Sequence, residues 1–363
     1  MDPLAHGLFG AAFARTRAGR ETSMALPVAI LAANVPDLDV FAYVRGGDFA
    51  LWFRRGWTHG PLGLLLLPPL VVGLVLLVRR WTGDGEARGL NVKRLGLIAY
   101  LMAVSHPLLD WLNTYGVRLL MPFEPRWFYG DALFIVDPWM WLLLGGSVFL
   151  CHESRRASVP SWALLAVATS ALLFLATNST AGKALWVAGL VAIGFGRARF
   201  GGRPASTRLA EALLAAFVVY TAAMVAGGRA AATIVRSELA QAGVGPIEGL
   251  MVGPQPMSPM RREVVVETSD SIRVGNFDWR RRPRVELGPW TAVPARGSSL
   301  GRRGLADPCV RGFANWARFP SIEVDEAAAA QGLERVHLID IRYARRPGPS
   351  FGAVTVENPP APP

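Results

Sequence analysis

The chain has 363 residues, 52% of them hydrophobic, and a mean hydropathy of +0.30, which exceeds the apolar content of an ordinary soluble domain and leaves room for two or three domains. A net charge of +11 is compatible with binding to nucleic acid, with binding to acidic lipid, or with the excess of positive residues in the cytoplasmic loops of membrane proteins. The distribution of the charge along the chain must decide among these three explanations. Only two cysteines are present, Cys151 and Cys309, which excludes a disulfide framework or a cysteine-based zinc site.

The first part of the chain is predicted to be an α-helical polytopic membrane bundle. Residues 3–14 are apolar but reach only about 18 Å as a helix, so we interpret them as a half-depth N-terminal helix. Asp2 and His6 stand where a signal peptide would be basic, so we expect this helix to stay in the mature protein. About seven spans are expected, each near the roughly 20 residues that a bilayer requires: 24–44, 61–78, 95–113, 135–151, 161–177, 183–196 and 209–226.

Arginine and lysine predict how these spans are oriented. The loops at 79–94, 152–160 and 197–208 are rich in arginine and lysine, whereas those at 114–134 and 178–182 carry few, so we expect the first set to be cytoplasmic. The arginines and lysines of the cytoplasmic loops account for much of the basic charge, so no nucleic-acid-binding function is needed to explain it. The loop at 45–56 is an exception, since it would be outside yet contains Arg45, Arg54 and Arg55, which we interpret as site residues.

The composition changes after about residue 228, where prolines, glycines and charges become frequent. Strand-like runs follow at 263–268, 271–278, 284–287, 322–324, 336–343 and 353–356. The sequence therefore predicts a transmembrane domain over residues 1–228, a small extracytoplasmic β-rich domain over 229–358 and a disordered tail over 359–363.

Six ionisable residues fall at or inside the apolar segments of the first third of the chain: His6, Asp37, Asp39, His59, His106 and Asp110. Such residues are unfavourable in hydrocarbon and usually mark function. His106 and Asp110 are four apart, so they share a helix face and could hold a metal or only a structural hydrogen bond. Asp37 and Asp39 beside Pro36 could equally stabilise a turn or cap a helix through side-chain hydrogen bonds to the backbone. His59 could simply mark the start of a helix.

The joint pattern favours a metal site, because several segments bring imidazole or carboxylate to a similar depth. Oxygen and nitrogen ligands suit zinc, manganese or iron better than copper. A metal with an open position activates water and polarises a phosphoryl or carbonyl oxygen, which is hydrolase chemistry. Asp39 could accept the proton of that water, and Arg54 or Arg55 could neutralise a phosphate.

The motifs resemble those of the membrane-bound metal-dependent hydrolases. This family is also described as inner-membrane-associated hydrolases with a reported link to the LexA repressor. It is distantly similar to zinc-dependent phospholipase C. The resemblance covers roughly residues 1–150 and rests on four motifs: Asp2-Pro3-x-x-His6-Gly7, Pro36-Asp37-x-Asp39, Arg55-Gly56-Trp57-Thr58-His59 and Ser105-His106-Pro107-x-x-Asp110-x-x-Asn113-Thr114-Tyr115-Gly116. The soluble domain resembles that of a subset through Trp316-Ala317-Arg318-Phe319-Pro320 and Asp340-x-Arg342-Tyr343.

The resemblance implies a set of site residues and a location. His6, Asp37, His59, His106 and Asp110 would be the metal ligands, with Asp39 beside them as a general base. Where many members have His-Arg-Gly, this chain has Arg54-Arg55-Gly56. The protein would be a multi-pass protein of the bacterial inner membrane.

The leading hypothesis is a membrane-embedded metal-dependent hydrolase, with zinc the first choice of metal, acting on a lipid or a lipid-linked phosphate or ester. No direct nucleic-acid partner is expected, and the C-terminal domain would bind an envelope or regulatory protein. Two alternatives stay open: a non-enzymatic membrane scaffold with a structural metal site, and an ion or proton transporter that uses the carboxylates as a relay.

Overall fold

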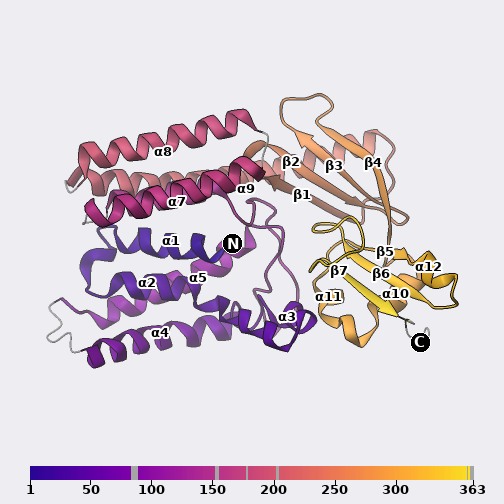
Figure 1. The fold of residues 1–363 in the computed structure, drawn as a ribbon, viewed down its shortest axis with the longest axis horizontal. Coiled ribbons are helices and arrows are strands. Elements are labelled where there is room, and N and C mark those ends of the chain that lie inside the picture. The colour runs from indigo at the N-terminus through magenta and orange to yellow at the C-terminus, as the bar shows by residue number, and fades with distance from the viewer. Residues whose placement is uncertain (83–88, 152–154, 177–178, 202–203, 358, 360–363) are drawn as a thin grey trace. The chain divides into compact units, whose positions relative to one another are not determined.

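The computed structural model describes residues 1–82, 89–151, 155–176, 179–201, 204–357 and 359. The chain forms two compact units (Figure 1). The helical unit comprises residues 1–38, 55–226 and 255–259, and the sheet unit comprises 39–54, 227–254 and 260–363. Parts of the predicted cytoplasmic loops (83–88, 152–154 and 202–203) and residues 360–363 of the predicted tail lie outside the described residues. The predicted domain boundaries at 228 and 358 stay predictions.

The helical unit is built from α-helices, with two short 3-10 segments near its N-terminus. Its elements are α1 Pro3–Ala14, η1 Gly19–Glu21, α2 Ala25–Asn34, the beginning of η2 Val35–Arg45, α4 Pro61–Thr82, α5 Val92–Trp111, α6 Pro138–Leu150, α7 Arg155–Ala176, α8 Thr180–Phe200 and most of α9 Pro204–Gln241.

Four helical stretches among the described residues are long and apolar enough to cross a membrane, by length and composition: Ala25–Arg45, Pro61–Thr82, Val92–Trp111 and Ala205–Gln241. The predicted number of seven is not confirmed. Three further apolar helices are shorter: Pro3–Ala14, Pro138–Leu150 and Val159–Leu175. The half-depth position predicted for the first of them stays a prediction.

Polar side chains fix where several of these helices begin. Asp2 caps α1 by accepting a hydrogen bond from the Ala5 amide at 3.0 Å. Asn91 caps α5 through the Arg94 amide. Since a capping side chain satisfies one of the free amides of the first turn, each of these residues sets the register of the helix that follows it.

Helix α5 is the central element for the candidate site. It packs against α2 and α4, and the shared core contains the buried residues Val28, Ala32, Val72, Leu95 and Met102. Large apolar residues on the other side of these helices are exposed, for example Leu70 and Leu97. The helices are therefore apolar on both faces, which suits a lipid environment.

The sheet unit contains a seven-stranded sheet among its described residues, with the strands in sequence order. The strands are β1 Gly249–Gln255, β2 Ser258–Glu267, β3 Ile272–Asp278, β4 Val285–Pro294, β5 Pro320–Val324, β6 Arg335–Asp340 and β7 Ala353–Glu357. Neighbours from β2 to β7 pair antiparallel. The unit also contains α3 Gly47–Phe53, α10 Ser299–Leu305, η3 Pro308–Val310, α11 Arg311–Trp316 and α12 Glu326–Ala329.

The predicted C-terminal β structure is confirmed, and two details are corrected. Strand β1 was not predicted, because Gly253 and Pro254 interrupt its apolar run. The strand predicted to run to residue 343 ends at Asp340, where the side chain accepts hydrogen bonds from the amides of Arg318 and Arg342 and so turns the chain. The Arg342 guanidinium also pairs with Asp340 at 2.7 Å, which ties together the two motifs on which the resemblance of this domain rests.

Candidate metal centre

Helix α5 supplies two side chains of the candidate site. His106 and Asp110 are both fully buried, and the His106 Nε2 atom lies 3.5 Å from Asp110 Oδ2. Because residues four apart lie one turn above each other on a helix, the two side chains project from the same face. The helix thus presents one imidazole and one carboxylate to the same point.

The 3-10 segment that follows α2 supplies Asp37. Helix α2 ends at Asn34, and the chain continues as η2. Pro36 has no amide hydrogen and restricts the residue before it, so a change of helix type at this point is expected. The side chain of Asp37 is 16% exposed, whereas those of His59, His106 and Asp110 are fully buried.

His59 lies in the turn before α4, and glycine shapes that turn. The amides of His59 and Gly60 both donate to the Gly56 carbonyl, at 3.0 and 2.8 Å. A Cβ atom on Gly60 would lie 1.9 Å from the Met121 carbonyl oxygen, so only glycine fits there. The tight turn holds the imidazole of His59 against α5.

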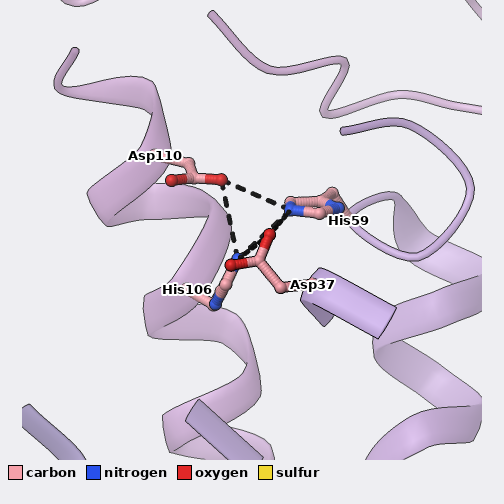
Figure 2. A group of neighbouring side chains, drawn as sticks. All are labelled: Asp37, His59, His106 and Asp110. Carbon is pink, nitrogen blue, oxygen red and sulfur yellow. Dashed lines mark hydrogen bonds and ion pairs between the residues drawn. The ribbon is translucent and has the colours of Figure 1, made fainter. Parts of the chain in front are cut away.

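The four side chains converge on one point (Figure 2). One ligand-competent atom from each of Asp37, His59, His106 and Asp110 lies within 4.8 Å of the others. The His59 Nε2 atom is 3.2 Å from His106 Nε2 and 3.3 Å from Asp110 Oδ2. Asp37 Oδ1 lies 3.9 Å from the first of these nitrogens and 3.7 Å from the second.

Each imidazole has a hydrogen-bond partner at its outer nitrogen, Nδ1. His106 Nδ1 lies 2.6 Å from the Ala33 carbonyl oxygen, which can only accept, so this nitrogen carries the proton. His59 Nδ1 lies 3.0 Å from the Thr58 hydroxyl. If Nδ1 is also the protonated nitrogen of His59, both Nε2 lone pairs face the shared centre. This arrangement is usual for metal-ligating histidines.

In that tautomer of both rings, the two unprotonated Nε2 atoms, 3.2 Å apart, repel each other unless a cation lies between or beside them. Asp110 Oδ2, which faces the same centre, is buried and accepts no hydrogen bond of good geometry. Since buried polar atoms are rarely left without partners, the residues present fit a metal ion with two nitrogen and two carboxylate donors.

The second oxygen of Asp110 faces a cationic environment. Arg55 Nη2 lies 3.2 Å from Oδ1, and the amino group of Met1 also contacts it. Arg55 is buried and donates to the Asn113 side-chain oxygen at 3.4 Å and to the Gly116 carbonyl at 3.2 Å. The two oxygens of Asp110 thus differ: one faces the imidazoles and the other is neutralised by arginine.

His6 lies beside the four-residue group but is not a member of it. Its imidazole stacks on that of His106, with ring centres 3.7 Å apart, and its Nε2 atom lies 3.4 Å from Asp110 Oδ1. His6 is therefore next to the neutralised oxygen of Asp110. Its predicted role as a fifth ligand stays a prediction.

Asp39 and Arg54, which were also predicted to be site residues, pair with each other. Arg54 Nε lies 3.2 Å from Asp39 Oδ1, and the guanidinium lies over the Tyr43 ring. Both residues belong to the sheet unit, whereas the four-residue group belongs to the helical unit. Their predicted catalytic roles stay predictions.

Sequence reasoning from charged residues missed the neutral groups that orient the site. These are the Thr58 hydroxyl, the Ala33 carbonyl and the Asn113 side chain, which also accepts from the amide of Tyr115 at 2.8 Å. Thr58 and Asn113 stand inside the motifs quoted above, so the signal was present in the sequence, but their types alone indicate no role.

A comparison with known protein families matches the part of the chain that contains the candidate site. The profile of a family described as YdjM inner membrane protein matches residues 1–182, which include all the candidate site residues. No curated protein and no solved structure matches the chain.

Proposed function

Because the chain belongs to the YdjM inner membrane protein family, we propose that it is a membrane-embedded metal-dependent hydrolase of the inner membrane. The observation that carries this proposal is the convergence of donor atoms from Asp37, His59, His106 and Asp110. We further propose that the protein is multi-pass and that its C-terminal domain is extracytoplasmic, since the distribution of arginine and lysine favours that orientation.

The proposed ligands are these four residues, with His6 as a fifth. Mixed imidazole and carboxylate donors suit zinc first, and manganese or iron next. When bound, a divalent metal of this kind lowers the pKa of water and polarises a phosphoryl or carbonyl oxygen.

The protein residues around the site would bind and orient the substrate. Arg55 is the proposed partner for a phosphate or a developing negative charge, because it already lies against Asp110 and is buried, where electrostatic interactions are stronger than in water. Asp37 is the most exposed of the four proposed ligands, so we propose that the substrate approaches past it.

The proposed substrate is a lipid or a lipid-linked phosphate or ester. The helices that carry the site expose large apolar residues, among them Leu70, Leu97 and Leu108, so a molecule with an acyl or prenyl chain would reach the site more readily than a free solute. Asp39 is the proposed proton acceptor, and its carboxylate lies 3.2 Å from the Arg54 guanidinium.

The first test is the metal content of the purified protein in detergent. We expect about one or two equivalents of zinc, manganese or iron in the wild type and loss of that metal in His106→Ala. The matched control is His337→Ala, since His337 belongs to the sheet unit, where it lies 2.9 Å from the Thr355 hydroxyl. Metal-free wild-type protein, or metal retained by His106→Ala, would contradict the proposal.

The second test separates an enzyme from a scaffold. Vesicles that contain phosphatidic acid would be incubated with the metal-loaded protein, and release of phosphate would be measured. Asp39→Asn is expected to abolish release while leaving the metal content unchanged. A scaffold with a structural metal would show no release in either protein.

A further inference from the structure

Residues 39–54, here called the arm, belong to the sheet unit although they lie between helices of the helical unit in sequence. The arm contains the end of η2 and helix α3, and α3 packs against α11 of the C-terminal part of the chain. The chain leaves the helical unit after Leu38 and returns to it at Arg55.

Asp48 holds the arm on α11. Its Oδ2 atom accepts a hydrogen bond from the Gly312 amide and its Oδ1 atom one from the Phe313 amide, both at 2.9 Å. The residue that precedes α11, Val310, provides no side-chain hydrogen bond to the helix. Asp48 therefore supplies the missing cap from 264 residues away in sequence.

The contact leaves no space for a larger residue at the partner position. A Cβ atom on Gly312 would lie 1.8 Å from the Asp48 carbonyl oxygen. A second contact reinforces the first, because the Arg311 guanidinium lies 5.8 Å from the centre of the Trp52 ring. Within the arm, Ala50 and Leu51 are buried. The arm is thus a packed part of the sheet unit.

We propose that the sheet unit, through Asp48, sets the positions of the candidate site residues that flank the arm. Asp37 stands two residues before the arm, Arg55 follows it directly, and His59 comes four residues after Arg55. Both ends of the arm are covalently joined to the segments that hold these residues. If the arm detaches from α11, the residues at its two ends should therefore become less well fixed in position. Asp48 is therefore a positioning residue. The effect on metal binding rests on the proposed function.

The test uses the full chain in nanodiscs with the substitution Gly312→Ala, which acts far in sequence from the site. The control is Gly348→Ala, because a Cβ atom there meets nothing within 4 Å. Amide hydrogen exchange would be measured for peptides that cover the arm and residues 55–60, where the His59 and Gly60 amides are hydrogen-bonded. We expect exchange at least about tenfold faster in both peptides, little change in β2 and β3, and about tenfold weaker metal binding.

The outcomes are distinct. Faster exchange in the arm alone, with exchange in residues 55–60 unchanged, would show that Asp48 stabilises only the packing of the arm within the sheet unit. This result would overturn the proposal. Unchanged exchange in both peptides would overturn it as well. A metal-free wild type would refute the proposed function, yet the exchange comparison would still decide the coupling. If Gly312→Ala does not fold, Asp48→Asn replaces it; this variant keeps one acceptor oxygen and is expected to show a smaller increase in both peptides.

Discussion

Replacement of Asp110 by asparagine separates a metal site from a structural ion pair. Asp110 is fully buried, and its two oxygens contact different groups: Oδ2 lies 3.3 Å from His59 Nε2, and Oδ1 lies 3.2 Å from Arg55 Nη2. Asp110→Asn keeps the shape of the side chain but removes its charge. Two effects are therefore expected at once, one on metal affinity and one on stability.

The magnitude of each effect follows from the contacts. Loss of an orienting group costs about 10–100-fold in metal affinity, so loss of a carboxylate donor should cost about 100-fold or more. Arg55 would be left buried without its carboxylate, which typically destabilises a protein by about 3–5 kcal/mol. For a unit of about 200 residues this corresponds to a fall in melting temperature on the order of 10 °C.

The double variant Asp110→Asn/Arg55→Gln distinguishes the two effects. It restores the charge balance, because both members of the Asp110–Arg55 pair lose their charge. We expect thermal stability in detergent to recover substantially, whereas metal affinity, measured by competition with a chelator, stays low. Recovery of both quantities would refute the reasoning, because it would mean that Asp110 serves only to neutralise Arg55. Unchanged metal affinity in Asp110→Asn alone would refute it as well.

Thr58→Val removes the hydroxyl that lies 3.0 Å from His59 Nδ1, so metal affinity should fall about tenfold with little change in melting temperature, as chelator competition would show. An unchanged affinity would mean that Thr58 does not orient the ring. In the sheet unit, side-chain and backbone hydrogen bonds from Arg280, with a further bond from Arg261, hold the pKa of Asp278 well below its usual 3.8. Its ionised form stabilises the fold above that value, so Asp278→Asn should lower stability by roughly 1–3 kcal/mol at pH 7, and the difference should shrink as the pH falls below about 4. A difference in denaturant unfolding that is as large at pH 2 as at pH 7 would contradict this assignment.

The sequence predicts those parts of the fold that depend on local pattern. Long apolar runs predict α4 and α5, and alternating residues with turn signals predict most strands of the sheet unit. The arm could not be predicted in this way, because η2 continues the apolar pattern of α2 and nothing local indicates that residues 39–54 pack on α11. That packing depends on the pairing of Asp48 with Gly312, which is a long-range contact.

The candidate site shows the same division between local and long-range information. The pairing of His106 with Asp110 follows from helical spacing alone. The distinction between Asp37, which joins the group, and Asp39, which pairs with Arg54, could not be predicted, since both follow Pro36 within three residues. On a 3-10 helix, residues two apart point in different directions, and the helix type was not evident from the sequence.

The arrangement of the two histidines argues against a purely structural cluster. A structural hydrogen bond within the helix bundle needs one imidazole and one carboxylate, and His106 with Asp110 would supply it. His59 brings a second imidazole to the same carboxylate, with its Nε2 atom 3.3 Å from Asp110 Oδ2 and 3.2 Å from His106 Nε2. Removing a second imidazole from water costs free energy, and a cation that attracted the Nε2 lone pairs of both rings would offset that cost. Arg55 cannot serve, since it is engaged at the opposite oxygen of Asp110. A cation at the point where the four donor atoms meet would make the burial of all four residues favourable together.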